Sequence, residues 1–97
     1  MVKRKIEWSP DATEDLKDIL SFYIERNGNK SYSNKLFKQI KRIISYLKDN
    51  NYLGKATDGK NIRVIFYQNY KILYEIKRVT IEIQMIWDMR RSPEDLE

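Results

Sequence analysis

Two alternating apolar runs separated by only two residues constrain the fold of the second half of this chain. The runs are Ile62–Tyr67 and Tyr70–Ile76. Alternation with a period of two predicts strands with one buried face, and a two-residue connection predicts a hairpin. A third run, Thr80–Trp87, follows and extends the hairpin to a three-stranded meander. Basic residues on the polar side of this meander indicate a surface that meets an anion.

The first half of the chain predicts one strand followed by two helices. Residues 3–8 alternate and predict the strand. Ser9-Pro10 then supplies an N-cap residue and a proline at the first helical position, and an apolar stripe continues to Gly28, which suits a left-handed cap. A second amphipathic helix is expected from Ser31 or Ser33 to about Asp49. The short connection predicts that the two helices form an antiparallel hairpin.

The order of these elements predicts an α+β fold. One strand, two helices and three strands with one-sided patterns favour a two-layer domain, in which the helix hairpin packs on one face of an antiparallel sheet. Residues 50–60 are expected to form a polar loop. A length of 97 residues predicts a single domain over residues 1–97.

Composition disfavours several classes of function. The chain has no cysteine and no histidine, so no metal site and no cofactor is expected. No apolar run approaches the ~20 residues that span a membrane, and no secretory signal is present, so we expect a cytoplasmic protein with no membrane partner. The balance of 19 basic and 14 acidic residues gives a net charge of +5. This excess favours an anionic partner, either nucleic acid or an acidic protein.

Several short motifs, none of them specific alone, follow one another along nearly the whole chain. They are Trp8-Ser9-Pro10, Ala12, Asp15-Leu16, Tyr23, Leu53-Gly54, Ile62-Arg63, Asn69–Tyr74, Ile86-Trp87-Asp88 and Arg90–Pro93. In their joint order and spacing they resemble the RelE/ParE family of toxins from bacterial type II toxin–antitoxin modules. The resemblance implies a small antiparallel sheet flanked by two helices, a basic concave surface, and a cognate antitoxin that wraps the toxin.

The family divides by target, and this division leaves the activity open. RelE-like members cut messenger RNA in the ribosomal A site, whereas ParE-like members poison DNA gyrase and are not nucleases. The long helix hairpin is similar to the ParE side, which implies a growth inhibitor of a gyrase-type target, as in plasmid stabilisation. The alternative is a RelE-like, metal-independent and ribosome-dependent mRNA endonuclease. A third interpretation is a decayed toxin that retains only antitoxin binding.

The resemblance implies three candidate catalytic residues, Arg63, Asp88 and Arg90. Arg63 matches an arginine that contacts the phosphate to be broken in RelE-like members, and a planar, permanently charged guanidinium suits that task. The alternative is a solvent-facing strand arginine. Asp88 stands where the family often has a histidine. It could act as a weak base, or it could pair structurally with Arg90 or Arg91.

Six residues are candidates for binding nucleic acid: Lys55, Lys60, Arg63, Tyr67, Lys71 and Arg91. The first two lysines precede the meander, where RelE-like nucleases place lysines that hold phosphates or stabilise charge, although solvated loop lysines are the alternative. Side chains alternate between the two faces of a strand. This alternation predicts Tyr70 and Tyr74 on the core side of the sheet, and Tyr67 on the same side as Arg63. Tyr67 is therefore the better candidate for stacking on a base, and Lys71 lies on the polar side with Glu75.

Overall fold

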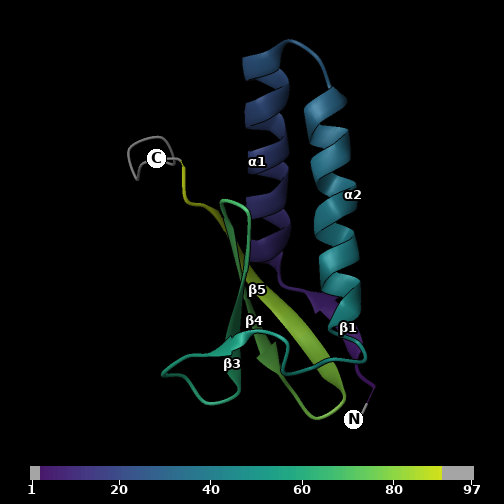
Figure 1. Cartoon of the computed structure of the whole chain (residues 1–97), viewed down its shortest axis with the longest axis vertical. Helices are drawn as coiled ribbons and strands as arrows, with labels where there is room; N and C mark the ends of the chain where they lie inside the picture. The colour runs from purple at the N-terminus through teal and green to yellow at the C-terminus, as the bar shows by residue number, and fades with distance from the viewer. Residues whose placement is uncertain (1–2, 91–97) are drawn as a thin grey trace.

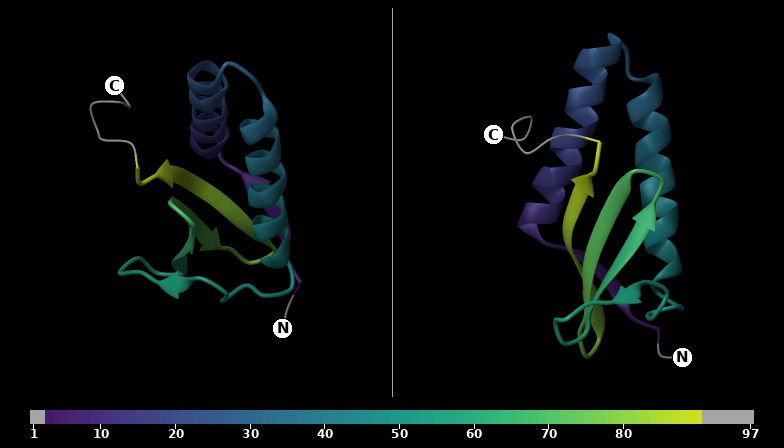
Figure 2. Two further views of the ribbon diagram at one scale, coloured as in Figure 1. Left: turned by 45° about the horizontal axis from the view of Figure 1, so that its top comes forward. Right: turned by 60° about the vertical axis from the view of Figure 1, so that its left-hand side comes forward.

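A computed structural model describes residues 3–90 and shows a helix hairpin packed on a five-stranded sheet (Figure 1). Both helices lie on one side of the sheet, as the two further views confirm (Figure 2). This arrangement confirms the predicted α+β class. In chain order the elements are β1 (Lys5–Trp8), α1 (Pro10–Asn27), α2 (Ser31–Tyr46), β2 (Lys55–Ala56), β3 (Ile62–Tyr67), β4 (Tyr70–Ile76) and β5 (Thr80–Asp88).

Local sequence determines both ends of α1. At the start, the Ser9 side chain accepts a hydrogen bond of 3.0 Å from the backbone N–H of Ala12, and Pro10 takes the first helical position. At the end, Gly28 adopts a left-handed φ of 74° and its N–H donates to the carbonyl oxygen of Ile24. Glycine adopts this conformation without the steric cost that a side chain carries. The predicted boundaries of α1 are therefore confirmed.

Helix α2 ends earlier than predicted, at Tyr46 rather than at Asp49. The reason is Asn51, a fully buried residue whose side-chain amide donates to the carbonyl oxygens of Leu47 and Lys48 at 2.7 and 3.3 Å. Such side-chain bonds offer the last carbonyls an alternative to further helical turns. The loop after α2 also contains the short strand β2, which the sequence did not indicate. No helix within residues 3–90 is long and apolar enough to cross a membrane.

The strands of the sheet lie in the order β1-β5-β4-β3-β2. The antiparallel prediction is confirmed for the meander, and the unpredicted β2 also pairs antiparallel with β3. The prediction is wrong for β1, which runs parallel to β5, with Lys5 opposite Thr80 and Trp8 opposite Ile83. Parallel neighbours require a long crossover, and the helices and meander between β1 and β5 provide it. Both β1 and β2 are edge strands as a result.

The core fills the space between the helix hairpin and the inner face of the sheet. Tyr70 and Tyr74 are fully buried on this face, as predicted. Because Tyr67 pairs directly with Tyr70 across the hairpin, alternate residues of β3 back to Arg63 share the same inner face. The interpretation that placed Arg63 and Tyr67 on the polar side is therefore wrong. The buried apolar side chains include Ala12, Leu16, Ile19, Leu36, Ile40, Ile44, Leu47, Ile72, Ile81, Ile83 and Ile86.

Candidate functional site

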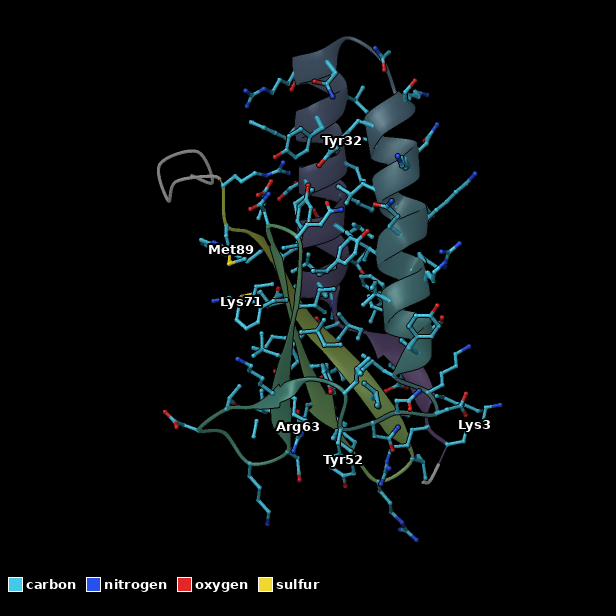
Figure 3. The ribbon with its side chains drawn as sticks, in the orientation of Figure 1. Lys3, Tyr32, Tyr52, Arg63, Lys71 and Met89 are labelled. Carbon is cyan, nitrogen blue, oxygen red and sulfur yellow. The ribbon has the colours of Figure 1, made fainter. Side chains whose placement is uncertain are left out.

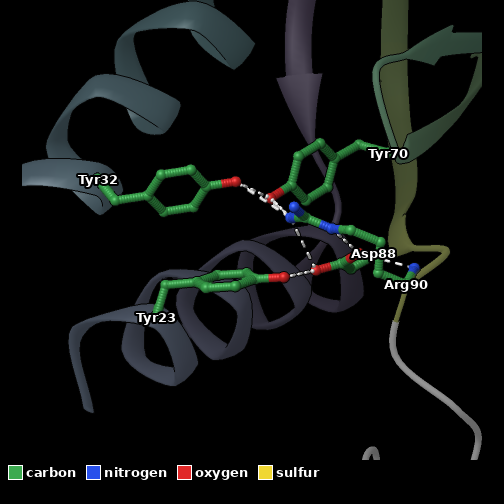
Figure 4. A network of polar contacts seen from close by, with 5 residues as sticks. All are labelled: Tyr23, Tyr32, Tyr70, Asp88 and Arg90. Carbon is green, nitrogen blue, oxygen red and sulfur yellow. Dashed lines mark hydrogen bonds and ion pairs between the residues drawn. The ribbon is translucent and has the colours of Figure 1, made fainter. Parts of the chain in front are cut away.

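A partly buried polar network, which we call the Asp88 network, joins the end of β5 to both helices (Figure 4). Its members are Tyr23, Tyr32, Tyr70, Asp88 and Arg90. The Asp88 carboxylate is 1% exposed and accepts a hydrogen bond of 2.5 Å from the Tyr23 hydroxyl. It also accepts bonds from the backbone N–H of Arg90 at 3.0 Å and from its Nε at 3.3 Å. These donors replace the water that a buried carboxylate has lost.

A β-bulge explains why Asp88 points inward. The register of β4 and β5 shifts between the Leu73–Met85 and Tyr74–Ile83 pairs, so that Gln84 has no opposite residue. The bulged backbone is held by the start of α1: the Ser9 hydroxyl donates to the carbonyl oxygen of Gln84, and Asp15 accepts the N–H of Ile86 at 3.0 Å. Beyond the bulge, Ile86 and then Asp88 face the core.

Arg90 is fixed among three aromatic rings. Its Nη2 atom donates to the Tyr32 hydroxyl at 3.0 Å and to the Tyr70 hydroxyl, and these two hydroxyls lie 2.8 Å apart. Its guanidinium carbon lies 5.1 Å from the centre of the Tyr23 ring and 5.2 Å from that of Tyr70. Cation–π contacts and charge-assisted bonds thus define the position of the guanidinium. Arg90 and Asp88 form an ion pair. This is the structural pairing that the sequence analysis gave for Asp88 as the alternative to a weak base.

The Asp88 network makes the protein less stable as the pH rises into the alkaline range. Burial, followed by the hydrogen bond to Asp88, raises the pKa of Tyr23 to about 12. The unfolded chain loses this proton near pH 10, whereas the folded chain keeps it. Between these pKa values the unfolded chain therefore binds one proton fewer than the folded chain at Tyr23. We expect this difference to lower the free energy of unfolding by up to ~1.4 kcal/mol for each pH unit of increase. Urea denaturation across this range should show a shallower fall for Tyr23→Phe.

The exposed residue Tyr46 provides the control for this pH dependence. Tyr46→Phe removes one phenol in the same way, but its hydroxyl lies outside the Asp88 network. We expect this variant to lose stability with pH as steeply as the parent chain. Equal slopes for the parent and Tyr23→Phe would contradict the assignment.

Arg63 takes part in a second set of contacts, which we call the loop clamp. Its guanidinium donates to the carbonyl oxygens of Gly54 at 2.6 Å and Tyr52 at 3.4 Å, and lies 4.9 Å from the centre of the Tyr52 ring. Beside it, the Tyr74 hydroxyl accepts the N–H of Gly54 at 2.9 Å and donates to the carbonyl oxygen of Asn51. The clamp holds the loop after α2 against β3 and β4.

The other predicted site residues do not gather at one place. Lys55 is exposed on β2 and Lys60 is exposed in the following loop. Lys71 lies half-buried on the outer face of β4, whereas Tyr67 packs against the core from the inner face. Arg91 lies outside the described residues. Figure 3 shows Arg63 and Tyr52 at the end of the sheet remote from Tyr32, so the structure groups Asp88 with Arg90 and leaves Arg63 apart from them.

Sequence reasoning missed a groove between β1 and α2, which has a volume of about 920 Å³. Its apolar part comes from Ile6, Trp8, Ile44 and Val79. Ser45 and the basic side chains just before and on β1, on α2 and in the turn after α2 complete the lining. The alternation of residues 3–8 and the helical stripe of α2 each indicate an apolar face. Neither pattern reveals that β1 is an edge strand beside α2, because strand order is not encoded locally.

The fold and these contacts define a small α+β domain whose mostly antiparallel sheet carries a helix hairpin on one face. The family model described as the ParE toxin of the type II toxin–antitoxin system, parDE, matches residues 6–93. The chain therefore belongs to the ParE toxin family. This result confirms the resemblance drawn from the motifs and places it on the ParE side. No curated protein sequence matches the chain significantly.

Three solved structures have the same fold. A chain of the chromosomal ParDE system from P. aeruginosa is 19% identical and has a TM-score of 0.75, covering 87% of this chain and 94% of its own. A chain of the E. coli DinJ-YafQ toxin–antitoxin complex is 12% identical with a TM-score of 0.60, covering 92% and 96%. YafQ from E. coli strain BL21(DE3) is 16% identical with a TM-score of 0.50, covering 91% and 96%.

Proposed function

We propose that this ParE-family toxin arrests growth by inhibiting DNA gyrase and does not cut RNA. The observation that carries the proposal is the state of Asp88, which stands where RelE-like members often have a histidine. A base that takes a 2′-OH proton must come within hydrogen-bond reach of the substrate. The Asp88 carboxylate is instead buried and already accepts bonds from Tyr23 and Arg90. Membership of the ParE family supports the same proposal.

The alternative is a ribosome-dependent mRNA endonuclease that uses Arg63 to hold the reacting phosphate. In this chain the Arg63 guanidinium is held by the carbonyl oxygens of Gly54 and Tyr52. Phosphate binding would have to replace these contacts, and the exposed Lys55 and Lys60 would have to supply the remaining charge.

Two assays on the purified chain distinguish these activities. We expect the chain to block supercoiling by gyrase, or to trap its cleavage complex, at concentrations that leave messenger RNA intact in a ribosome-containing translation extract. Primer extension would detect cleavage at codon positions. Codon-specific cuts together with uninhibited supercoiling would overturn the proposal and establish the endonuclease.

The variant Arg63→Ala tests the role of the loop clamp. We expect it to lower the free energy of unfolding by about 1–2 kcal/mol, because it removes a charge-assisted hydrogen bond to the carbonyl oxygen of Gly54 and a stacking contact with Tyr52. Gyrase inhibition, corrected for the folded fraction, should be unchanged. Arg78→Ala, in the exposed turn between β4 and β5, is the matched control and should cost little. An Arg63→Ala chain that folds normally but loses an RNA-cutting activity would contradict this role.

A cognate antitoxin neutralises the toxin in this proposal. The solved relatives include a ParDE system and a DinJ-YafQ toxin–antitoxin complex. This chain also exposes large apolar side chains that a partner could cover, among them Phe66, Val79 and Met89. Cells that express the chain should recover growth when the adjacent reading frame of its operon is co-expressed. Continued arrest, with both proteins present, would count against that partner.

A further inference from the structure

The sheet carries a second apolar surface on the face that points away from the helices, and we call this surface the outer patch. Its apolar members lie side by side on β3, β4 and β5: Val64, Phe66, Leu73, Met85 and Trp87. None of them belongs to the hydrophobic core of residues 3–90 or packs against it. Phe66 is 53% exposed, and both helices lie on the opposite side of the sheet (Figure 2). The outer patch is therefore open to a partner.

Two opposite charges flank Leu73 at the centre of the outer patch. Lys71 and Glu75 lie on the same face of β4 as Leu73, one on each side of it. Both side chains are half-buried, and neither forms an ion pair within residues 3–90. Four residues of a strand span about 13 Å, so these two charges cannot pair with each other. Both would gain from a counter-charge on a partner.

The order of charge, leucine and opposite charge along β4 is complementary to itself under two-fold symmetry. Consider two facing sheets related by an axis that lies between them, at right angles to β4 and level with Leu73. Lys71 then faces the partner's Glu75, and the two copies of Leu73 face each other. An axis parallel to β4 would instead bring the two copies of Lys71 together, and like charges would repel. The charges thus favour one of these two symmetric packings.

We propose that the outer patch binds the outer patch of a second copy of this chain, with the two β4 strands antiparallel. Face-to-face packing of sheets buries the apolar side chains of both copies and gives each Lys71 and Glu75 a counter-charge. The patch extends over only three strands, so we expect a dissociation constant in the micromolar range rather than an obligate dimer. A nucleic acid would leave Glu75 facing phosphate groups of the same sign.

Exchanging the two charges tests this dimer in sedimentation velocity experiments over a concentration series. Lys71→Glu places acidic side chains opposite each other, and we expect it to weaken dimerisation at least roughly tenfold. Lys71→Glu/Glu75→Lys should recover most of this loss, because each position 71 still faces a position 75 of opposite charge. Lys38→Glu, on the exposed side of α2, makes the same charge change and should dimerise as the parent chain does. Circular dichroism would establish that all variants fold.

A crosslink at the symmetry axis provides an independent measurement. The chain has no cysteine, so Leu73→Cys introduces one thiol per chain. In the dimer this thiol faces its counterpart across the spacing of packed sheets, which is about 10 Å. A short bismaleimide should therefore join two Leu73→Cys chains. Val79→Cys is the control, because this exposed position between β4 and β5 lies away from the axis, and it should crosslink much less.

Three results would overturn the proposed dimer. The first is a parent chain that stays monomeric at millimolar concentration. The second is dimerisation that Lys71→Glu leaves intact, or that the charge exchange fails to restore, because the interface would then lie elsewhere. The third is a monomeric parent chain whose inhibition of gyrase is lost in Lys71→Glu but kept in Lys38→Glu, which would assign the outer patch to the target. Loss of the proposed gyrase activity alone would leave the dimer standing.

Discussion

Replacing Arg90 with methionine should lower the free energy of unfolding by about 2–3 kcal/mol. The change leaves the Asp88 carboxylate, whose side chain is fully buried, without its counter-charge. Removing one partner of a buried ion pair typically costs ~3–5 kcal/mol, and we expect the lower figure because the Arg90 side chain is 40% exposed and solvent screens the pair. Methionine keeps much of the contact with the rings of Tyr23 and Tyr70. Urea denaturation at neutral pH measures the loss.

A double-mutant cycle separates the ion pair from general effects of the substitution. Asp88→Asn in the Arg90→Met background should cost less than it does in the parent chain, with a coupling energy of at least about 1 kcal/mol. Arg42→Met on the exposed side of α2 is the matched control and should be nearly neutral. Additive effects of the Arg90 and Asp88 substitutions would show that the pair is not energetically coupled.

Replacing Gly54 with alanine should lower the free energy of unfolding by about 3 kcal/mol. A Cβ atom at this position would lie 2.7 Å from the carbonyl oxygen of Val64 and 2.9 Å from a ring carbon of Tyr74. Overpacking of this kind typically costs ~1–3 kcal/mol. The backbone of Gly54 also bonds to Arg63 and Tyr74, so any movement that relieves the clash weakens the loop clamp. Chemical denaturation again provides the measurement.

Gly59 offers the comparison for Gly54. A Cβ atom there would approach the terminal methyl carbon of Ile62 at 2.9 Å, and the flexible end of a side chain can move at little cost. Gly59→Ala should therefore cost less than about 1 kcal/mol. A Gly54→Ala chain as stable as Gly59→Ala would mean that the loop moves freely away from β3, contrary to the contacts described.

The fold could be predicted where local patterns are strong. Ser9, Pro10 and Gly28 determine α1 through capping, and the two-residue connection between β3 and β4 determines their pairing. The parallel pairing of β1 with β5 could not be predicted, because it joins Lys5 to Thr80 through no local signal. The end of α2 was missed because the cap is a side chain, Asn51, several residues beyond the last turn.

The candidate site was harder to predict because its residues depend on register. Pairing of Tyr67 with Tyr70 places Arg63 on the inner face, and the bulge at Gln84 turns Asp88 toward the core. A shift of one residue in either strand would reverse these faces. The pairing of Asp88 with Arg90 was within reach of the sequence, because the two residues are close along the chain. The contribution of Tyr32 was not, because this residue lies in the first turn of α2, 58 residues before Arg90 in the sequence.

The parallel position of β1 has a consequence for the order in which the sheet forms during synthesis. Residues 5–8 are made before both helices and before β3 and β4, whereas their partners in the sheet, residues 80–83, are made after them. Bringing together segments so far apart carries a large loop-closure cost, so we expect β1 to dock after the meander has formed. The groove beside β1 then exists only after β5 has been made and β1 has paired with it. A partner that recognises this groove would bind a toxin molecule only once its sheet has closed.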